Sequence, residues 1–248
     1  MKHLTLIGIG TGNPDHVTLQ AIRAINGADV ILIPQKGPDK ADLAEVRQVI
    51  LDATLTSTAT RVVPFDLPVR DAGHQNYEAG VSHWHDAIAR AWRAALAPYP
   101  DADTVALLVW GDPGLYDSTL RIAARLHPAP AVTVIPGISA PQVLAAAHGI
   151  ALNTVGGPYL TTTGRRLRDH GWPEGAGTLV VMLDGDCAFR TLDPAGMTIW
   201  WGAYVGMAEE ILDHGPLAEA GPRIIATRAA ARAAHGWIMD IYVLRCAR

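Results

Sequence analysis

The sequence predicts an α/β protein of two α/β domains, with a parallel sheet in the first, a mixed sheet in the second and an active-site cleft between them. In the first half, short apolar runs alternate with segments of helical period, which is typical of parallel strands joined by helices. In the second half, the strand-like runs follow one another more closely, which favours a mixed sheet. A chain of 248 residues that is 49% hydrophobic can bury the cores of two such domains.

The most informative stretch is a predicted strand–helix–strand unit in the middle of the chain. Its strands are expected at residues 105–110 and 131–135, with a short helix between them. Strands joined by such a crossover are parallel and buried on both faces. Ligands bind beyond the carboxyl ends of parallel strands. We therefore expect the turns at residues 111–114 and 136–140 to lie on one rim, which is the candidate active site.

The other elements follow from apolar spacing and from glycine and proline breaks. In the first half, strands are expected at residues 4–9, 30–33 and 61–65, helices at residues 18–26, 43–50 and 77–96, and helix caps at Asp117 and Ser118. In the second half, helices are expected at residues 142–148 and around 208–212, and strands at residues 178–183, 197–201, 224–227 and 238–244. A domain boundary is expected near residues 117–118, which gives the domains 1–117 and 118–248. No secondary structure is predicted for residues 228–235.

Composition and motifs exclude several classes of protein. The formal net charge of -4 gives no reason to expect nucleic acid, which usually needs a basic face. No apolar run approaches the roughly 20 residues that span a bilayer, and the start, MKHLTLIGIG, lacks the layout of a signal peptide. Cys187 and Cys246 have no motif spacing and are expected to be reduced thiols of a cytoplasmic protein. His83 and His85 are expected on a helix surface, where positions two apart cannot share a metal ion.

The candidate rim carries a carboxylate but no dedicated nucleophile. The turn at residues 8–15 lacks the third glycine of the dinucleotide fingerprint, which argues against a nicotinamide reductase domain. The sequence has no P-loop, nucleophile elbow or metal cluster, so transfer of an already activated group fits better than hydrolysis by a triad. Asp112 is the one carboxylate fixed at the rim. Arg165, Arg166 and Arg168 either bind a ligand with several carboxylates or lie on a solvated helix face.

Five blocks, in their order and spacing, resemble the tetrapyrrole methyltransferase family over nearly the whole chain. They are residues 7–15 (IGIGTGNPD), 110–118 (WGDPGLYDS), 135–140 (IPGISA), 182–184 (MLD) and 201–206 (WGAYVG). The resemblance implies two α/β domains, a homodimer, and S-adenosylmethionine bound in the cleft between the domains and converted to S-adenosylhomocysteine. It places cofactor contacts, largely through backbone groups, on Thr11, Gly111, Asp112, Leu115, Ser139, Ala140, Met182, Gly202, Ala203 and Tyr204.

Within the family, the chain is most similar to members that methylate C-1 of the corrinoid precursor precorrin-5 and release its acetyl group as acetate, in the oxygen-dependent route to cobalamin. Water must attack the acetyl carbonyl in that reaction, so we hypothesise that Asp112 is an orienting group or the base. Arg70, Arg165 and Arg166 are expected to bind the carboxylates of the substrate. Two alternatives stay open: methylation at another corrinoid carbon, and a non-catalytic carrier that passes on a corrinoid intermediate.

Overall fold

The computed structural model describes residues 1–35, 42–70 and 76–246. The chain divides into two compact units, Met1–Ser139 and Ala140–Arg248. The boundary lies after Ser139 rather than at residues 117–118, because the strand Ala131–Ile135 (β5) pairs with the first strand of the chain and so belongs to the first unit.

The first unit is built on a five-stranded parallel sheet with the strand order β3-β2-β4-β1-β5. Its strands are His3–Gly8 (β1), Val30–Gln35 (β2), Arg61–Asp66 (β3), Thr104–Val109 (β4) and Ala131–Ile135 (β5). The predicted parallel sheet is confirmed. Both β4 and β5 pair with β1, so the strand–helix–strand unit holds β1 between its two strands.

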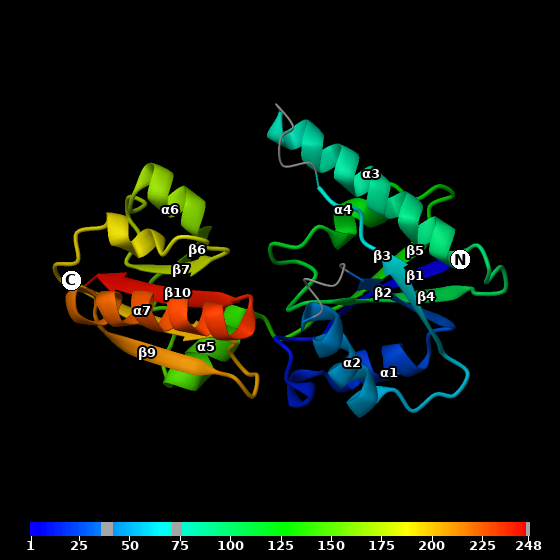
Figure 1. Ribbon diagram of the computed structural model, residues 1–248, viewed down its shortest axis with the longest axis horizontal. Coiled ribbons are helices and arrows are strands. Elements are labelled where there is room, and N and C mark those ends of the chain that lie inside the picture. Colours follow the sequence, from blue (N-terminus) through cyan, green and yellow to red (C-terminus); the bar gives the residue numbers. More distant parts are fainter. Residues whose placement is uncertain (36–41, 71–75, 247–248) are drawn as a thin grey trace. The chain divides into compact units, whose positions relative to one another are not determined.

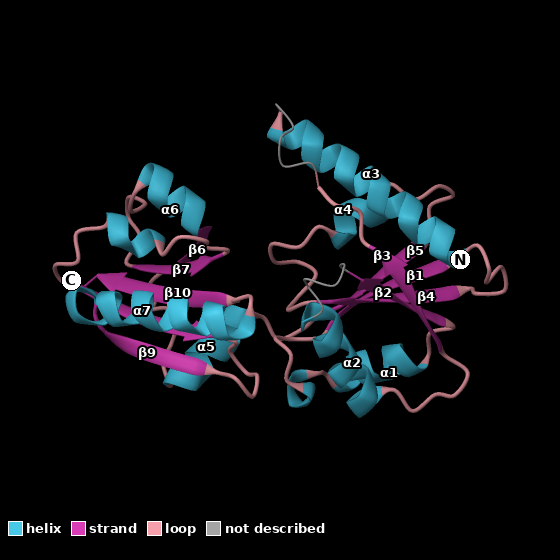
Figure 2. Cartoon of the chain, in the orientation of Figure 1, coloured by secondary structure: helices cyan, strands magenta, loops and turns pink. Residues whose placement is uncertain are grey.

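Helices cover both faces of this sheet (Figures 1 and 2). They are Leu19–Asn26 (α1) and Asp42–Thr54 (α2) on one face, and Tyr77–Leu96 (α3) and Thr119–Ala123 (α4) on the other. Alternate strand residues therefore enter different cores: Leu6 packs with residues of α3, and Ile7 packs with residues of α1 and α2. β4 is buried on both faces, as predicted, but residues 131–134 of the edge strand β5 are exposed.

The second unit is built on a mixed five-stranded sheet with the order β6-β7-β10-β8-β9, as predicted. Its strands are Leu160–Thr163 (β6), Thr178–Met182 (β7), Met197–Ala203 (β8), Ile211–Pro216 (β9) and Asp240–Cys246 (β10). β6 and β7 are parallel, whereas β10 runs antiparallel to both of its neighbours. Ala140–His148 (α5) packs on one face, and Gly164–His170 (α6) and Leu217–His235 (α7) pack on the other.

Two predictions for the last part of the chain are wrong. In place of a helix that continues through residues 208–212, the chain enters strand β9 at Ile211, and its residues alternate between half-buried and exposed positions beside β8. The strand expected at residues 224–227 lies inside α7, a helix of 19 residues that also contains residues 228–235. The alanine-rich sequence after residue 225 sustains the helix, and Ile224 is apolar because it packs against the sheet.

The packing of α3 separates its two histidines. His83 is exposed, as predicted, but His85 is buried, because α3 packs against α4 as well as against the sheet. Burial, together with the guanidinium groups of Arg125 and Arg121, lowers the pKa of His85. The prediction of a surface position is therefore wrong for His85.

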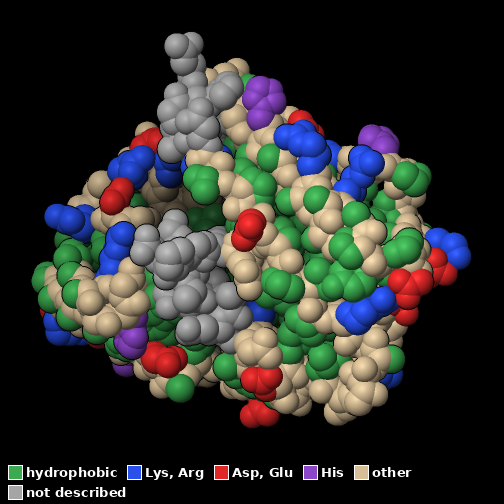
Figure 3. Space-filling view, turned by 45° about the vertical axis from the view of Figure 1, so that its right-hand side comes forward, with side chains coloured by type: hydrophobic (Ala, Val, Ile, Leu, Met, Phe, Trp, Pro, Cys, Tyr) green, Lys and Arg blue, Asp and Glu red, His purple; other side chains and the backbone are tan. Residues whose placement is uncertain are grey.

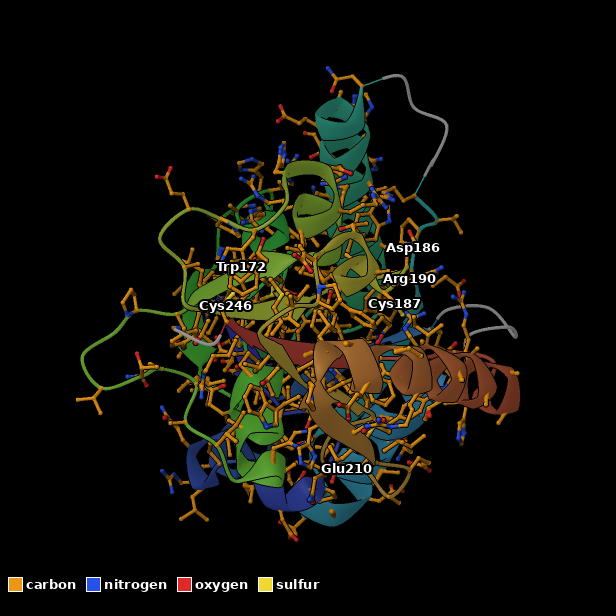
Figure 4. The ribbon with its side chains drawn as sticks, turned by 90° about the vertical axis from the view of Figure 1, so that its left-hand side faces the viewer. Trp172, Asp186, Cys187, Arg190, Glu210 and Cys246 are labelled. Atoms are coloured by element: carbon orange, nitrogen blue, oxygen red, sulfur yellow. The ribbon has the colours of Figure 1, made fainter. Side chains whose placement is uncertain are left out.

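Neither cysteine forms a disulfide bond. Cys187 and Cys246 are free thiols that lie well apart in Figure 4. On the face shown in Figure 3, lysine and arginine side chains are interspersed with aspartate and glutamate side chains. Within the described residues, no helix has the length and hydropathy of a transmembrane span.

Candidate active site

Three loops meet beyond the carboxyl ends of β1, β4 and β5. Gly10, after β1, and Gly111, after β4, form a reciprocal backbone pair. The Gly10 N–H donates to the Gly111 carbonyl oxygen at 3.2 Å, and the Gly111 N–H donates to the Gly10 carbonyl oxygen at 2.8 Å. Gly111 has a φ of +65°, which glycine adopts without strain. We call the site where this pair meets Gly137, from the loop after β5, the glycine cradle.

Gly137 and Asp112 join the third loop to the pair. The Gly137 N–H donates to Asp112 Oδ2 at 2.9 Å, and the Gly114 N–H donates to Asp112 Oδ1 at 2.7 Å. A Cβ atom on Gly137 would lie 2.1 Å from the carbonyl oxygen of Gly111, so only glycine fits there. The two turns that were predicted to share one rim therefore do so, and the Asp112 carboxylate holds them together.

Thr11, Leu115 and Ser139 are in the loops that form the glycine cradle. Thr11 is 3% exposed, and its hydroxyl has no hydrogen-bond partner among the residues that the structure describes. The Leu115 N–H donates to the carbonyl oxygen of Asp112 at 3.2 Å, and Ser139 is buried. Leaving a buried hydroxyl unpaired costs about 1 to 3 kcal/mol, so a ligand that paired with Thr11 would recover part of that free energy.

Other predicted cofactor contacts belong to the second unit. Ala140 begins α5 and Met182 ends β7, and both pack against the same apolar cluster. Gly202 and Ala203 are the last residues of β8. A Cβ atom on Gly202 would lie 2.6 Å from Val205 Cγ1 and 2.8 Å from Leu144 Cδ1, so a side chain at that position would require these two side chains to shift.

Tyr204 follows β8 and is 2% exposed. Its hydroxyl donates to the carbonyl oxygen of Trp237 at 2.5 Å, and its N–H donates to the carbonyl oxygen of Met239 at 2.9 Å. Its φ of +51° turns the chain sharply after the strand. The phenol ring is thus a packing group of the second unit.

The predicted substrate-binding arginines are exposed. Arg70 follows β3 in the first unit, and Arg165 and Arg166 lie on α6 in the second. Arg168, on the same helix, pairs through Nη1 with Asp186 Oδ2 at 3.2 Å (Asp186 is labelled in Figure 4). The structure therefore leaves the guanidinium groups of Arg70, Arg165 and Arg166 at the surface, where a ligand rich in carboxylates can reach them.

The second unit contains a buried polar network that the sequence did not predict. Arg228 Nε donates to Asp240 Oδ2 at 2.8 Å, and Arg228 Nη2 donates to the carbonyl oxygen of Asp184 at 2.9 Å. Trp201 Nε1 also donates to Asp240 Oδ2, and the Tyr242 hydroxyl donates to Asp184 Oδ2 at 2.6 Å. The network fixes the loop after β7 against α7 and β10. To predict this network, one would have to place Arg228 on a helix that packs against β10.

A cavity of about 170 Å³ in the first unit lies at the carboxyl ends of β2 and β4. Trp110, directly before Gly111, lines it, so it adjoins the glycine cradle. Its charged lining residues are Arg47 and Asp117. Arg47 Nε donates to the carbonyl oxygen of Leu108 at 3.1 Å. The sequence indicated Asp117 only as a helix cap within the family block at residues 110–118, and it gave no signal for Arg47, which lies in no motif.

The chain matches the family model for Tetrapyrrole (Corrin/Porphyrin) Methylases over residues 3–221. It is 49% identical over 250 residues to a Sinorhizobium sp protein named Precorrin-6A synthase (deacetylating). The match covers 99% of this chain and 95% of that relative. A second Sinorhizobium sp relative, named Precorrin-2 C(20)-methyltransferase, is 33% identical over 54% of each chain.

Solved structures agree with these sequence matches. A protein from Corynebacterium diphtheriae, described as cobalamin synthesis related (CobF), has a TM-score of 0.80 and 38% identity, covering 99% of this chain and 98% of that one. Uroporphyrin-III C-methyl transferase from Thermus thermophilus, solved with S-adenyl homocysteine, has a TM-score of 0.60 and 20% identity, covering 98% of this chain and 97% of that one. At that identity the second match shows a common fold.

Proposed function

The chain belongs to the tetrapyrrole (corrin/porphyrin) methylase family, and from that premise we propose that it is an S-adenosylmethionine-dependent C-methyltransferase of cobalamin biosynthesis. The proposed reaction methylates precorrin-5 at C-1, releases acetate and gives precorrin-6A. The observation that carries the proposal is the full-length match to the relative named for the deacetylating synthesis of precorrin-6A. The match to the C(20)-methyltransferase spans only half of the chain and does not favour another carbon.

The glycine cradle fits S-adenosylmethionine, whose sulfonium supplies an already activated methyl group. Backbone groups rather than charged side chains form the cradle, and the buried Thr11 hydroxyl lacks a partner among the described residues. The residues that would hold the cofactor are Thr11, Gly111, Asp112, Leu115 and Ser139 in the first unit, and Ala140, Met182, Gly202, Ala203 and Tyr204 in the second. With an activated methyl group, these residues mainly position the reactants and exclude water.

Asp112 is assigned the role of orienting group rather than that of the base. Both of its carboxylate oxygens already accept a backbone N–H, one from Gly114 and one from Gly137. These bonds hold the carboxylate at the junction of two loops, and its charge complements the N–H groups around it. Asp112 therefore keeps the cradle in the geometry that the cofactor needs.

The substrate carries many carboxylates, which guanidinium groups bind well. We assign that role to Arg70, Arg165 and Arg166, which are exposed. Reversing their charge is expected to weaken binding of the corrinoid far more than binding of the cofactor. We also propose that the protein works as a cytoplasmic homodimer, as the family resemblance implies, and light scattering at micromolar concentration measures that state.

The proposed function is tested by incubation with precorrin-5 and methyl-labelled S-adenosylmethionine, with label and acetate followed together by mass spectrometry. Labelled product with matching acetate is the expected result. Label without acetate would move the methylation to another carbon. Tight binding of the corrinoid with no affinity for S-adenosylmethionine would favour a carrier instead of an enzyme.

A further inference from the structure

We propose that the cavity beside the glycine cradle is the deacetylation subsite: it receives the acetyl group of the substrate, Asp117 accepts the proton of the attacking water, and Arg47 holds the oxygen that becomes the acetate carboxylate. This inference rests on the proposed function. It assigns the base that takes the proton of the attacking water, a role that Asp112 does not fill. Both residues line the cavity, which adjoins the cradle through Trp110.

The inner space of the cavity has room for a small group. Its volume is about 170 Å³, comparable to a buried cavity of roughly 150 Å³ that holds benzene, and its open side leads to solvent. Aromatic and aliphatic side chains make up much of the wall, among them Phe65, Trp84 and Ile88. Such a wall suits a methyl group, so a two-carbon acyl group with its attacking water matches the cavity in volume and polarity.

The charged lining supplies a base and a cation of the kind that acyl cleavage needs. Arg47 Nε is fixed by the carbonyl oxygen of Leu108, at the end of β4. Burial lowers the pKa of Arg47 to about 10, an effect that the charge of Asp117 opposes, so the guanidinium stays positive at neutral pH. Asp117 Oδ1 accepts the Thr119 N–H at 2.6 Å, which orients the carboxylate at the start of α4.

The wall of the cavity also contains a buried indole nitrogen. Trp92 lines the cavity and is 3% exposed, yet its Nε1–H has no hydrogen-bond partner among the described residues. An unpaired buried donor is rare in folded proteins and calls for a partner. This nitrogen is closed off from solvent, so a ligand in the cavity would reach it only after the Trp92 ring had moved. Arg47 then offers its guanidinium to the oxygen on which negative charge develops, as catalytic donors to oxyanions do.

The proposed step balances in atoms and charge. The oxygen of water bonds to the acetyl carbon, the π pair of the carbonyl moves onto its oxygen, and one proton of the water passes to the Asp117 carboxylate. The C=O bond then re-forms as the bond between the acetyl carbon and C-1 breaks, and the electron pair of that bond stays on C-1. Acetic acid leaves and ionises to acetate, and Asp117 returns its proton to the solvent. The electron pair on C-1 is the nucleophile that the proposed methylation uses, so deacetylation and methylation are coupled by chemistry rather than by a second active site.

The test compares the wild type with Asp117→Asn, Arg47→Met and Arg47→Lys, with precorrin-5 and methyl-labelled S-adenosylmethionine. Asp117→Asn and Arg47→Met are expected to lower kcat for acetate release and for methyl transfer together, by about 100-fold or more. Arg47→Lys keeps the charge and should recover part of the rate. Asp52→Asn, which changes an exposed carboxylate on the same helix as Arg47, is the matched control and should leave both rates unchanged.

Two binding measurements separate this role from damage to the fold. All variants should bind S-adenosylhomocysteine within about twofold of the wild type by calorimetry, because the cradle is intact. Line broadening of 13C-acetate by the wild type should be lost in Arg47→Met.

Variants that keep the wild-type rate of acetate release would overturn the subsite while the proposed function stands. A higher KM with an unchanged kcat would also overturn it, since the cavity would then hold a carboxylate side chain of the macrocycle. A wild type that produces neither acetate nor methylated product would instead remove the proposed function.

Discussion

At the scale of single residues, the glycine cradle forms because glycine has no Cβ atom. Gly137 approaches the backbone of Gly8 and Gly111 more closely than any side chain would allow. Asp112 adds two hydrogen bonds that hold the loops in this contact. The site is therefore marked by small residues because two backbones must meet there, and a ligand can then reach backbone N–H and C=O groups directly.

Gly137→Ala tests this close contact. The new Cβ atom would lie 2.1 Å from the carbonyl oxygen of Gly111, so the loops must separate. We expect at least a tenfold weaker Kd for S-adenosylhomocysteine and a loss of about 1 to 3 kcal/mol in the free energy of unfolding. Calorimetry and urea unfolding measure the two effects. Gly177→Ala, where nothing lies within 4 Å of the new atom, is the control, and equal behaviour of the two variants would refute the close-contact account.

Asp112→Asn tests the orienting role. Asparagine has a single side-chain oxygen, so one of the two backbone N–H groups loses its acceptor. We expect weaker binding of S-adenosylhomocysteine and at least a tenfold lower kcat/KM for methyl transfer, with helix content retained by circular dichroism. Asp101→Asn, at an exposed carboxylate, serves as the control. Near-normal turnover of the Asp112 variant would take this residue out of the mechanism.

Cys187 gives a prediction about pH. Burial raises the pKa of its thiol from 9.0 to about 11. Because the folded state holds the proton more tightly, the stability from the neutral thiol is full below pH 9.0 and is lost as the pH rises towards about 11. Alkylation by iodoacetamide at pH 8, followed by peptide mass mapping, should be about 100-fold slower at Cys187 than at an ordinary thiol. Rapid labelling in the folded protein would contradict the burial.

At the scale of elements, the second unit is held by a buried ion pair between α7 and β10. The side chains of Arg228 and Asp240 are 11% and 6% exposed, and Trp201 donates to the same carboxylate. Removing one charge leaves the other buried without its partner. Arg228→Met should therefore lower the free energy of unfolding by about 3 to 5 kcal/mol.

The matched comparison is Arg223→Met on the same helix. Arg223 pairs with Asp213 at 2.8 Å, but its side chain is 52% exposed, so water replaces the lost partner. Urea unfolding followed by tryptophan fluorescence should show a much smaller effect than for Arg228→Met. Equal losses for the two variants would show that the buried pair does not stabilise this unit.

The same elements show what local sequence can and cannot predict. Strands of the first sheet and the long helix α3 were predictable because apolar spacing and glycine or proline breaks agree there. β9 and α7 were not, because residues 208–212 carry helical spacing whereas pairing with β8 decides the structure. Ile224 is β-branched for packing against the sheet, not for strand formation. Tertiary contacts override local preference at such positions.

At the scale of the whole molecule, the rim was predictable and the cavity was not. Parallel strands bring their carboxyl ends to one edge by topology alone, so the turns that contain Asp112 and Gly137 had to meet. Arg47, on α2, and Asp117, just before α4, line one cavity although the two helices cover opposite faces of the sheet, and no spacing in the sequence predicts this. The division after Ser139 likewise depends on the pairing of β5 with β1.

The most direct test of the central claim is the ratio of acetate released to methyl transferred, measured over a full time course in water enriched in oxygen-18. The proposed reaction predicts one acetate for every methyl group at all times, with one heavy oxygen atom in each acetate. Methyl transfer that proceeds without acetate, or acetate that contains no heavy oxygen, would contradict a deacetylating methylation driven by attack of water.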